Sequence, residues 1–174
     1  ISTDIKECVK DSDLIIIASP LSSFKEIILS IKEDLKKGTI LTDTGSVKKE
    51  VMKIIHNINL KEINWIPSHP IAGTEESGPK AGNADMFENR WCILSPPKDA
   101  DAQSINSLKL LWEAMGSKVK IMTPEEHDEI LSLTSHLPHA IAYNIVRTVI
   151  NVEDKLQQEV IQYSAGGLRD FTRI

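Results

Sequence analysis

The sequence has few cysteines, no block of basic residues and no long apolar run. Its two cysteines, Cys8 and Cys92, stand outside any CxxC spacing, which disfavours a disulfide framework and is typical of the reducing cytoplasm. The longest uninterrupted apolar run, Leu14 to Ala18, is far shorter than the ~20 residues that a membrane span needs. The net charge is −5 and lysines are interspersed with acidic residues, which argues against a nucleic-acid surface. We therefore expect a cytoplasmic protein that binds neither membranes nor nucleic acids.

The composition is that of a globular protein. The chain has 174 residues, 41% of them hydrophobic and 26% charged, which is enough for one domain or for one domain and part of another. It has no charged-then-apolar leader with a small-residue cleavage site, so nothing indicates export. The first residue is Ile1 rather than Met, and the chain stops at Ile174 directly after a glycine-rich motif. We expect an internal fragment of a longer protein.

Up to about residue 122, short runs of β-branched residues alternate with segments whose apolar residues have the spacing of a helix. Leu14–Ala18 is apolar at successive residues, which predicts a parallel strand buried on both faces. Further strands are expected at residues 39–42, 63–67, 91–94 and 118–122, and helices at residues 4–10, 24–37, 47–58 and 105–115. This alternation predicts a parallel sheet with helices on its faces.

The pattern changes at Thr123. Thr123–Glu126 reads as a capping box with proline at the first helical position. A long helix is expected to follow as far as Val152, with Pro138 inside it, and a further helix over residues 151–163. We place a domain boundary at about residue 122, between the α/β part (residues 1–122) and an all-helical part (residues 123–174).

Polar residues follow three of the expected strands where each strand ends. Because parallel sheets bind ligands at the carboxyl ends of their strands, we expect these residues to line one crevice. Gly45 would let the backbone approach a flat ligand, and Ser46 offers a hydroxyl that donates and accepts. The simpler alternative is that each polar residue only caps the next helix. The residues are Ser19-Pro20, Asp43-Thr44-Gly45-Ser46 and Ser68-His69-Pro70.

His69 is expected in a stiff turn, because it lies between Pro67 and Pro70 and Gly73 follows. A neutral imidazole accepts a proton from a hydroxyl near pH 7, so His69 is a candidate general base. The alternative is an ordinary histidine of a surface loop.

Pro138 is expected to kink the long helix that contains it, because it has no N–H for the carbonyl of Thr134 and its ring crowds that carbonyl. A site lined by His136 and His139 would offer partners to the freed polar groups. The alternatives are a kinked packing helix with a buried histidine, or a metal site. A lone H-x-x-H without HExxH is a weak ligand pattern, so we expect no metal.

The last motif, Gly166–Arg173, has two glycines followed by alternating basic and acidic residues, which suggests a tight turn. Arg173 is a candidate for clamping a carboxylate with two hydrogen bonds. A solvated arginine is the alternative.

Taken together, five motifs in this order resemble the prephenate/arogenate dehydrogenase (TyrA) family over nearly the whole chain. They are Asp43–Lys48 (DTGSVK), His69–Glu75 (HPIAGTE), Thr123–Asp128 (TPEEHD), Ser135–His139 (SHLPH) and Gly166–Arg173 (GGLRDFTR). The resemblance implies a Rossmann-like NAD(P)-binding domain, here incomplete, followed by an incomplete helical domain that binds substrate and forms a homodimer. It implies oxidative decarboxylation of prephenate or arogenate in tyrosine biosynthesis, with NAD or NADP as cofactor and NAD favoured.

The resemblance also implies residue roles. His69 would hydrogen-bond the ring hydroxyl of the substrate, and Ser46 would lie between that hydroxyl and the nicotinamide. His139 and Arg173 would bind substrate, with Thr74 and Glu75 near the same pocket. The residues expected against the cofactor are Ser19, Pro20, Leu21, Asp43 and Ser46.

One departure from the family separates this chain from a complete enzyme. The family begins with a strand, a G-x-G-x-x-G turn and a helix that hold the pyrophosphate, and this sequence contains no such segment. The residue that separates NAD from NADP is missing with it. We therefore expect most of the substrate pocket but only part of the cofactor site.

Two other readings remain open. One is a nicotinamide dehydrogenase of the β-hydroxy acid type, which uses a catalytic lysine on its helical domain, although no lysine lies between Pro124 and Asn151. The other is a non-catalytic module for ligand sensing or dimerisation, which would have no need for His69 paired with Ser46.

Overall fold

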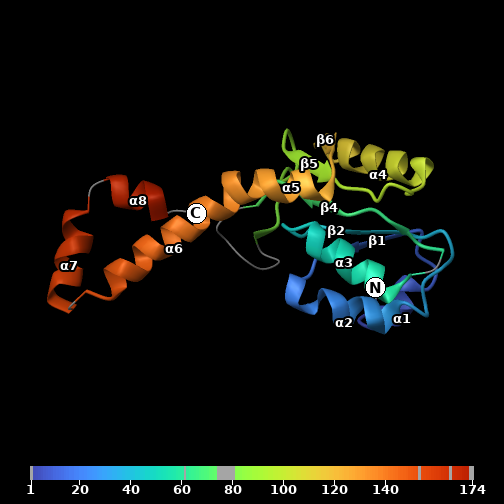
Figure 1. Ribbon diagram of the computed structural model, residues 1–174, viewed down its shortest axis with the longest axis horizontal. Coiled ribbons are helices and arrows are strands. Elements are labelled where there is room, and N and C mark those ends of the chain that lie inside the picture. The colour runs from blue at the N-terminus through green and yellow to red at the C-terminus, as the bar shows by residue number, and fades with distance from the viewer. Residues whose placement is uncertain (1, 61, 74–80, 153, 165, 173–174) are drawn as a thin grey trace.

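The structure is a computed structural model that describes residues 2–60, 62–73, 81–152, 154–164 and 166–172. An α/β part is followed by a helical arm that extends away from it (Figure 1). The strands are β1 (Leu14–Ile17), β2 (Ile40–Asp43), β3 (Asn64–Trp65), β4 (Ser68–Pro70), β5 (Trp91–Leu94) and β6 (Lys118–Ile121). The helices are α1 (Ile5–Val9), α2 (Leu21–Ile31), α3 (Lys49–Ile58), α4 (Ala102–Ala114), α5 (Pro124–Leu131), the π-helix η2 (Ser132–His136), α6 (Leu137–Ile150), α7 (Asp154–Tyr163) and α8 (Gly166–Thr172).

The strands among the described residues form two three-stranded sheets joined by one segment of chain. The first has the order β1-β2-β3 with parallel pairing, and the second has the order β4-β5-β6. Between the sheets, Ile66 N–H donates to the Leu41 carbonyl and Ser95 N–H donates to the Pro67 carbonyl. The segment from β3 to β4 thus passes from β2 to β5, which brings the ends of β2 and β4 together.

The expected parallel pairing is confirmed for β1 with β2, β2 with β3 and β5 with β6, and the unpredicted strand β4 is the exception. β4 and β5 run antiparallel, with His69 opposite Ile93, whereas β5 and β6 are parallel. A parallel neighbour needs a crossover, and the described part of the connection between β4 and β5 contains no α-helix. The chain therefore runs along β4 first and returns in the opposite direction along β5.

Two apolar clusters fix the helices against the strands. Phe24 and Ile28 of α2 pack with Leu41 of β2, Val51 of α3 and other buried residues. The second cluster joins α4 to β5 and includes Leu94, Leu108 and Trp112. Figure 1 shows α2 and α3 beside β1 and β2, and α4 beside β5 and β6. Each fully buried side chain of this kind stabilises the fold by about 1.5–3 kcal/mol.

β1 is less covered than its sequence predicts. Ile17 is buried, but Ile16 is 40% exposed, so the strand is not buried on both faces. Within the described residues β1 lies at the edge of its sheet and pairs only with β2, which leaves one side without a packing partner. The apolar run shows that the strand can be buried, but the elements that pack against it determine how much of its surface is buried.

The helical part begins as predicted and then departs from regular geometry. The Thr123 side chain accepts from Glu126 N–H while the Glu126 carboxylate accepts from Thr123 N–H, which confirms the capping box. The single long helix is wrong, because η2 interrupts it and α6 begins after the interruption. Pro138 lies in the first turn of α6, which continues directly from η2, so its missing N–H falls within a continuous helical run.

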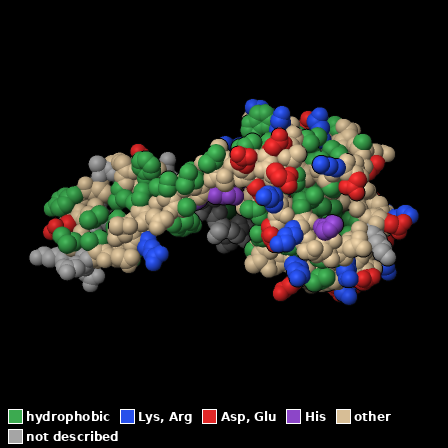
Figure 2. Space-filling view, in the orientation of Figure 1, with side chains coloured by type: hydrophobic (Ala, Val, Ile, Leu, Met, Phe, Trp, Pro, Cys, Tyr) green, Lys and Arg blue, Asp and Glu red, His purple; other side chains and the backbone are tan. Residues whose placement is uncertain are grey.

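Many apolar side chains of the arm face solvent, as Figure 2 shows over α6 to α8. Tyr143 is 72% exposed, Tyr163 73% and Phe171 66%, and Leu137, Ile141 and Ile150 are exposed as well. Among the described residues, no helix is both long enough and apolar enough to cross a membrane.

Candidate active site

The residues expected against a cofactor come together in one hollow at the carboxyl ends of β1 and β2. The hollow has a volume of about 190 Å³, and Ser19, Pro20, Leu21, Asp43 and Ser46 all line it. The Ser19 hydroxyl is buried and has no hydrogen-bond partner within the described structure. A buried hydroxyl without a partner costs free energy, so a polar ligand group is well suited to this position. The hollow therefore fits part of a nucleotide cofactor.

Gly45 is required here for a reason other than ligand approach. A Cβ built on Gly45 would lie 2.9 Å from Asp43 Oδ2, and Gly45 N–H donates to the same oxygen over 3.0 Å. The sequence suggested that glycine makes room for a flat ligand. The contact that the structure shows is instead with the side chain of Asp43.

Asp43 forms a buried ion pair with Lys48. The distance between Lys48 Nζ and Asp43 Oδ2 is 2.6 Å, and both side chains are almost completely buried. Burial raises the pKa of Asp43 and lowers the pKa of Lys48, while their mutual attraction opposes both shifts. Lys48 Nζ also donates to the Ser68 carbonyl over 2.7 Å. The pair thus links the end of β2 to the residue before His69.

His69 lines a second, larger hollow of about 580 Å³ together with Gly73, Arg90, Ser135 and His139. The expectation of a turn at His69 is wrong, because His69 lies in β4. Its backbone is held by pairing with β5, and Pro70 marks the end of the short strand. A residue in a paired strand is positioned more rigidly than a residue in a free loop.

The imidazole of His69 is hydrogen-bonded to a second, fully buried histidine. His69 Nδ1 lies 2.9 Å from His127 Nε2, and His127 Nδ1 lies 2.7 Å from Asp128 Oδ1. Burial, reinforced by the charges that His127 and Lys48 can carry, lowers the pKa of His69 to about 3. His69 is therefore neutral at physiological pH, as a proton acceptor must be.

The π-helix η2 places His139 at the wall of the same hollow. His139 Nδ1 lies 2.7 Å from the Ser135 carbonyl, so the ring satisfies a backbone group within the irregular turn. The sequence predicted that His136 and His139 would offer partners to polar groups freed by Pro138, above all the Thr134 carbonyl; the structure shows the His139 ring on the Ser135 carbonyl instead. His136 does not line the hollow, although its charge would further lower the pKa of His69.

Other predicted residues are apart or undescribed. Ser46 lines the smaller hollow and His69 the larger one, and no hydrogen bond joins them in the structure. Thr74, Glu75 and Arg173 lie outside the described residues. Their roles remain predictions.

Sequence reasoning missed four residues as functional candidates. His127 and Asp128 were noted only as part of a helix start and Lys48 only as part of a motif, while Arg90 carried no signal. Arg90 is exposed, and neither hydrogen bond nor ion pair engages its guanidinium in the described structure. The histidine next to an aspartate was the one usable signal, since neighbouring carboxylates commonly orient imidazoles.

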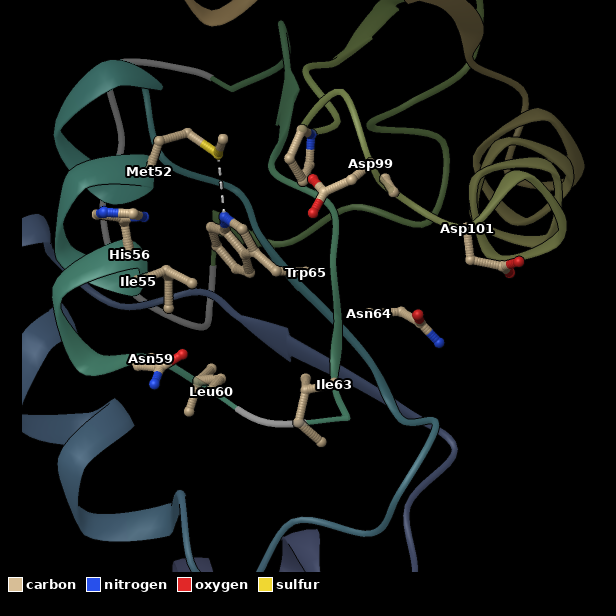
Figure 3. Close-up of a pocket in the computed structure, with 12 residues that line it drawn as sticks. Met52, Ile55, His56, Asn59, Leu60, Ile63, Asn64, Trp65, Asp99 and Asp101 are labelled. Carbon is tan, nitrogen blue, oxygen red and sulfur yellow. Dashed lines mark hydrogen bonds between the residues drawn. The ribbon is translucent and has the colours of Figure 1, made fainter.

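Two further observations limit the choice of site. No cluster of three or more His, Cys, Asp or Glu side chains suited to a metal ion occurs among the described residues. A separate hollow of about 280 Å³ lies between α3, β3 and the chain before α4, where Trp65 Nε1 donates to Met52 Sδ over 3.3 Å (Figure 3). None of the predicted site residues lines it.

Fold and site together define a Rossmann-like nucleotide-binding protein with a helical second part. Residues 2–128 match the family model for the nucleotide-binding domain of prephenate dehydrogenase, and residues 123–174 match its dimerization domain. The chain belongs to the prephenate dehydrogenase family.

Individual relatives agree with this assignment. The chain is 40% identical over 174 residues to cyclohexadienyl dehydrogenase of Zymomonas mobilis and 33% identical over 170 residues to prephenate dehydrogenase of Bacillus subtilis. It covers 59% and 45% of these proteins, and they align with 100% and 95% of this chain. Prephenate dehydrogenase from Aquifex aeolicus in complex with hydroxyphenyl propionate and NAD+ is similar in structure, with a TM-score of 0.87 and 35% identity over 99% of this chain and 59% of that one. The chain thus spans about half the length of the relatives it matches.

Proposed function

We propose that the full-length protein oxidatively decarboxylates prephenate or arogenate in tyrosine biosynthesis, with NAD or NADP as the oxidant. The observation that carries this proposal is the neutral imidazole of His69 at the wall of a hollow large enough for a small ring compound. The second ring nitrogen, Nε2, makes no hydrogen bond within the described structure, whereas Nδ1 is bound to His127. That nitrogen is available to accept the proton of a substrate hydroxyl.

The residues of this chain would act on the proton and on the carboxylates. The oxidised nicotinamide supplies the hydride acceptor when it is bound. As the hydroxyl carbon of the substrate loses hydride, His69 Nε2 takes the hydroxyl proton and a carbonyl forms. Loss of the ring carboxylate as CO2 then makes the ring aromatic. A positioned base contributes about 10²–10⁴-fold to such a rate.

Substrate carboxylates need cations in the same hollow. Arg90 lies in its wall, and no ion pair within the described part of the chain engages it, which makes it a candidate for one carboxylate. Arg173 is the second candidate, on the family resemblance alone. His139, already held by the Ser135 carbonyl, would contribute orientation rather than charge.

NAD is the favoured cofactor in this proposal. The Aquifex aeolicus relative is described in complex with NAD+, and it is 35% identical to this chain. Ser19, Pro20, Leu21, Asp43 and Ser46 would contact the nicotinamide end, because their hollow lies at the carboxyl ends of β1 and β2.

We also infer that the protein forms a homodimer through the helical arm. We propose that it acts in the cytoplasm. The arm exposes large apolar side chains over α6 to α8, and an exposed apolar surface of this kind marks an interface. The matching family model is described as a dimerization domain. No step of the reaction chemistry depends on this inference.

Turnover by the full-length protein tests the proposal. Reduced nicotinamide is followed by its absorbance with prephenate and with arogenate, each in the presence of NAD and of NADP. We expect turnover with at least one pair, and a kcat about 10²–10⁴-fold lower in His69→Asn with KM changed little. The matched control is His56→Asn, an exposed histidine of α3 outside the larger hollow.

Absence of turnover with both substrates in a folded protein would reject the proposal. It would favour another nicotinamide dehydrogenase or a ligand-sensing module. Unchanged kcat in His69→Asn would instead reject the assignment of the base while leaving the reaction in place.

A further inference from the structure

We propose that His127 and Asp128 are positioning residues that fix the tautomer of His69, so that its unprotonated nitrogen faces the substrate. The proposal rests on the proposed function for its catalytic consequence, but its structural core is independent of any substrate. It follows from the hydrogen-bond chain that joins Asp128, His127 and His69.

In the network of hydrogen bonds from Asp128 through His127 to His69, only one assignment of donors and acceptors is consistent. Asp128 is anchored as a carboxylate: Oδ1 accepts from Lys48 N–H over 2.7 Å and Oδ2 accepts from Lys49 N–H over 2.9 Å. Partial burial acts to raise its pKa, but these bonds and the contact with His127 outweigh that effect and the pKa is lowered. An ionised carboxylate only accepts hydrogen bonds, so His127 Nδ1 must carry the proton.

The rest of the chain follows from this starting point. Burial keeps His127 neutral by lowering its pKa, against the opposing effect of Asp128. A neutral imidazole protonated at Nδ1 has a lone pair at Nε2, so His127 Nε2 must accept. His69 Nδ1–H is then the donor across the 2.9 Å contact, and His69 Nε2 is left unprotonated. That nitrogen is the one that the proposed reaction needs as its base.

The anchor itself is rigid. Asp128 binds the first backbone N–H groups of α3 from α5, across a sequence separation of 80 residues at Lys48. His127, the preceding residue of α5, is completely buried. The other charged or titratable groups whose fields act on the His69 ring are Lys48 and His136, and both would disfavour its protonated form. The charge of Asp128 has the opposite effect and favours the protonated form of His69.

The arrangement also explains what happens to charge during the proposed step. The proton of the substrate hydroxyl moves to His69 Nε2, and the Nδ1–H bond to His127 remains in place. The positive charge on His69 is then stabilised through His127 by the carboxylate of Asp128. Removal of the acceptor nitrogen of His127 would abolish both the fixed tautomer of His69 and the stabilisation of its positive charge through His127.

The decisive test is the tautomer of His69 in the ligand-free, full-length protein. Nitrogen-15 NMR of labelled histidine distinguishes a protonated from an unprotonated ring nitrogen. We expect His69 and His127 both to be protonated at Nδ1 and unprotonated at Nε2. Protonation of His69 at Nε2 in the wild-type protein would overturn the proposal, whatever the enzyme turns over.

Three variants connect the tautomer to catalysis. His127→Leu removes the acceptor, so His69 should lose its fixed tautomer and kcat should fall about 10²-fold or more; a wrong tautomer in a hydrolase triad costs about 10⁴-fold. His127→Gln places an amide oxygen where Nε2 was and should restore the tautomer and kcat to within about tenfold. Asp128→Asn keeps an oxygen for Lys48 N–H and His127 Nδ1–H, so it should preserve the tautomer and lower kcat.

The readouts separate positioning from mere folding. A purely structural role would give His127→Gln and His127→Leu equal losses, with the tautomer of His69 unchanged in each, and would refute the proposal. His56→Leu is the matched control, because it removes an exposed histidine from α3 outside the hollow. If the wild-type protein lacks dehydrogenase activity but shows the expected tautomers, the proposed function fails and the positioning network stands.

Discussion

Lys48 Nζ lies 2.6 Å from Asp43 Oδ2 in a pair that solvent scarcely reaches. The two lie five positions apart along the chain, yet the same ammonium group also binds the Ser68 carbonyl in β4. The pair therefore holds the end of β2 against the start of β4. The ion pair therefore stabilises the walls of both hollows, the one lined by Ser19 and Ser46 and the one lined by His69.

Removing Lys48 alone should be strongly destabilising. Lys48→Met leaves Asp43 buried without its counter-charge, and breaking a buried pair in this way costs about 3–5 kcal/mol. The double variant Lys48→Met with Asp43→Asn should recover at least half of that loss, because no charge is left unpaired. Urea denaturation of the two variants measures the difference. Equal stability of single and double variants would contradict a role for the ion pair.

Ser19→Ala should separate stability from cofactor binding. The Ser19 hydroxyl is buried and lacks a partner in the described structure, so its removal should stabilise the ligand-free protein by about 1 kcal/mol. If the hydroxyl binds the cofactor, the Kd for NAD should rise about tenfold. Thermal unfolding without ligand and calorimetric titration with NAD provide the two measurements. Ser22→Ala, on the exposed side of α2, is the control.

Arg90→Ala should weaken substrate binding. Loss of one charge-assisted contact costs about 1.5–3 kcal/mol, which corresponds to a KM roughly 10–100-fold higher. Arg90→Lys should recover part of the loss, since it keeps the charge without the bidentate geometry. Lys109→Ala on α4 is a control outside the hollow. A normal KM in Arg90→Ala would show that the guanidinium does not bind the substrate.

The stability of the protein should decrease as the pH falls from about 6.5 towards 3. The folded-state pKa of His69 is lowered to about 3 from 6.5, so between these values the unfolded chain binds a proton that the folded protein does not. The contribution is fully present above pH 6.5 and is lost on acidification, with a slope of up to about 1.4 kcal/mol per pH unit for one proton. His127 shifts in the same direction.

Comparison of His69→Asn with the wild-type protein isolates this contribution from that of the carboxylates. Denaturation midpoints measured at pH 7, 6 and 5 should fall less steeply for the variant. Parallel slopes would show that His69 titrates normally in the folded protein.

Local sequence was enough to predict much of the α/β part. The alternation of apolar runs placed every strand of the first sheet within a few residues, and Thr123 and Glu126 predicted the start of α5 together with its capping box. These features depend on neighbouring residues and on the burial periodicity of one element. The residues after β1 and β2 share a hollow as expected, because parallel strands end at one edge, but His69 and Pro70, expected in the same crevice, line the larger hollow instead.

What the sequence by itself determined, then, is the class of the fold, its family and the identity of His69 as a candidate base. The tertiary structure decided what surrounds that base. The contact of His69 with His127 spans 58 residues and that of Lys48 with Asp128 spans 80. Whether β4 pairs parallel or antiparallel, which nitrogen of His69 is engaged and whether Lys48 is buried all depend on how distant segments pack. Burial and hydrogen-bond partners set the charge and orientation of these groups, and no local pattern encodes them.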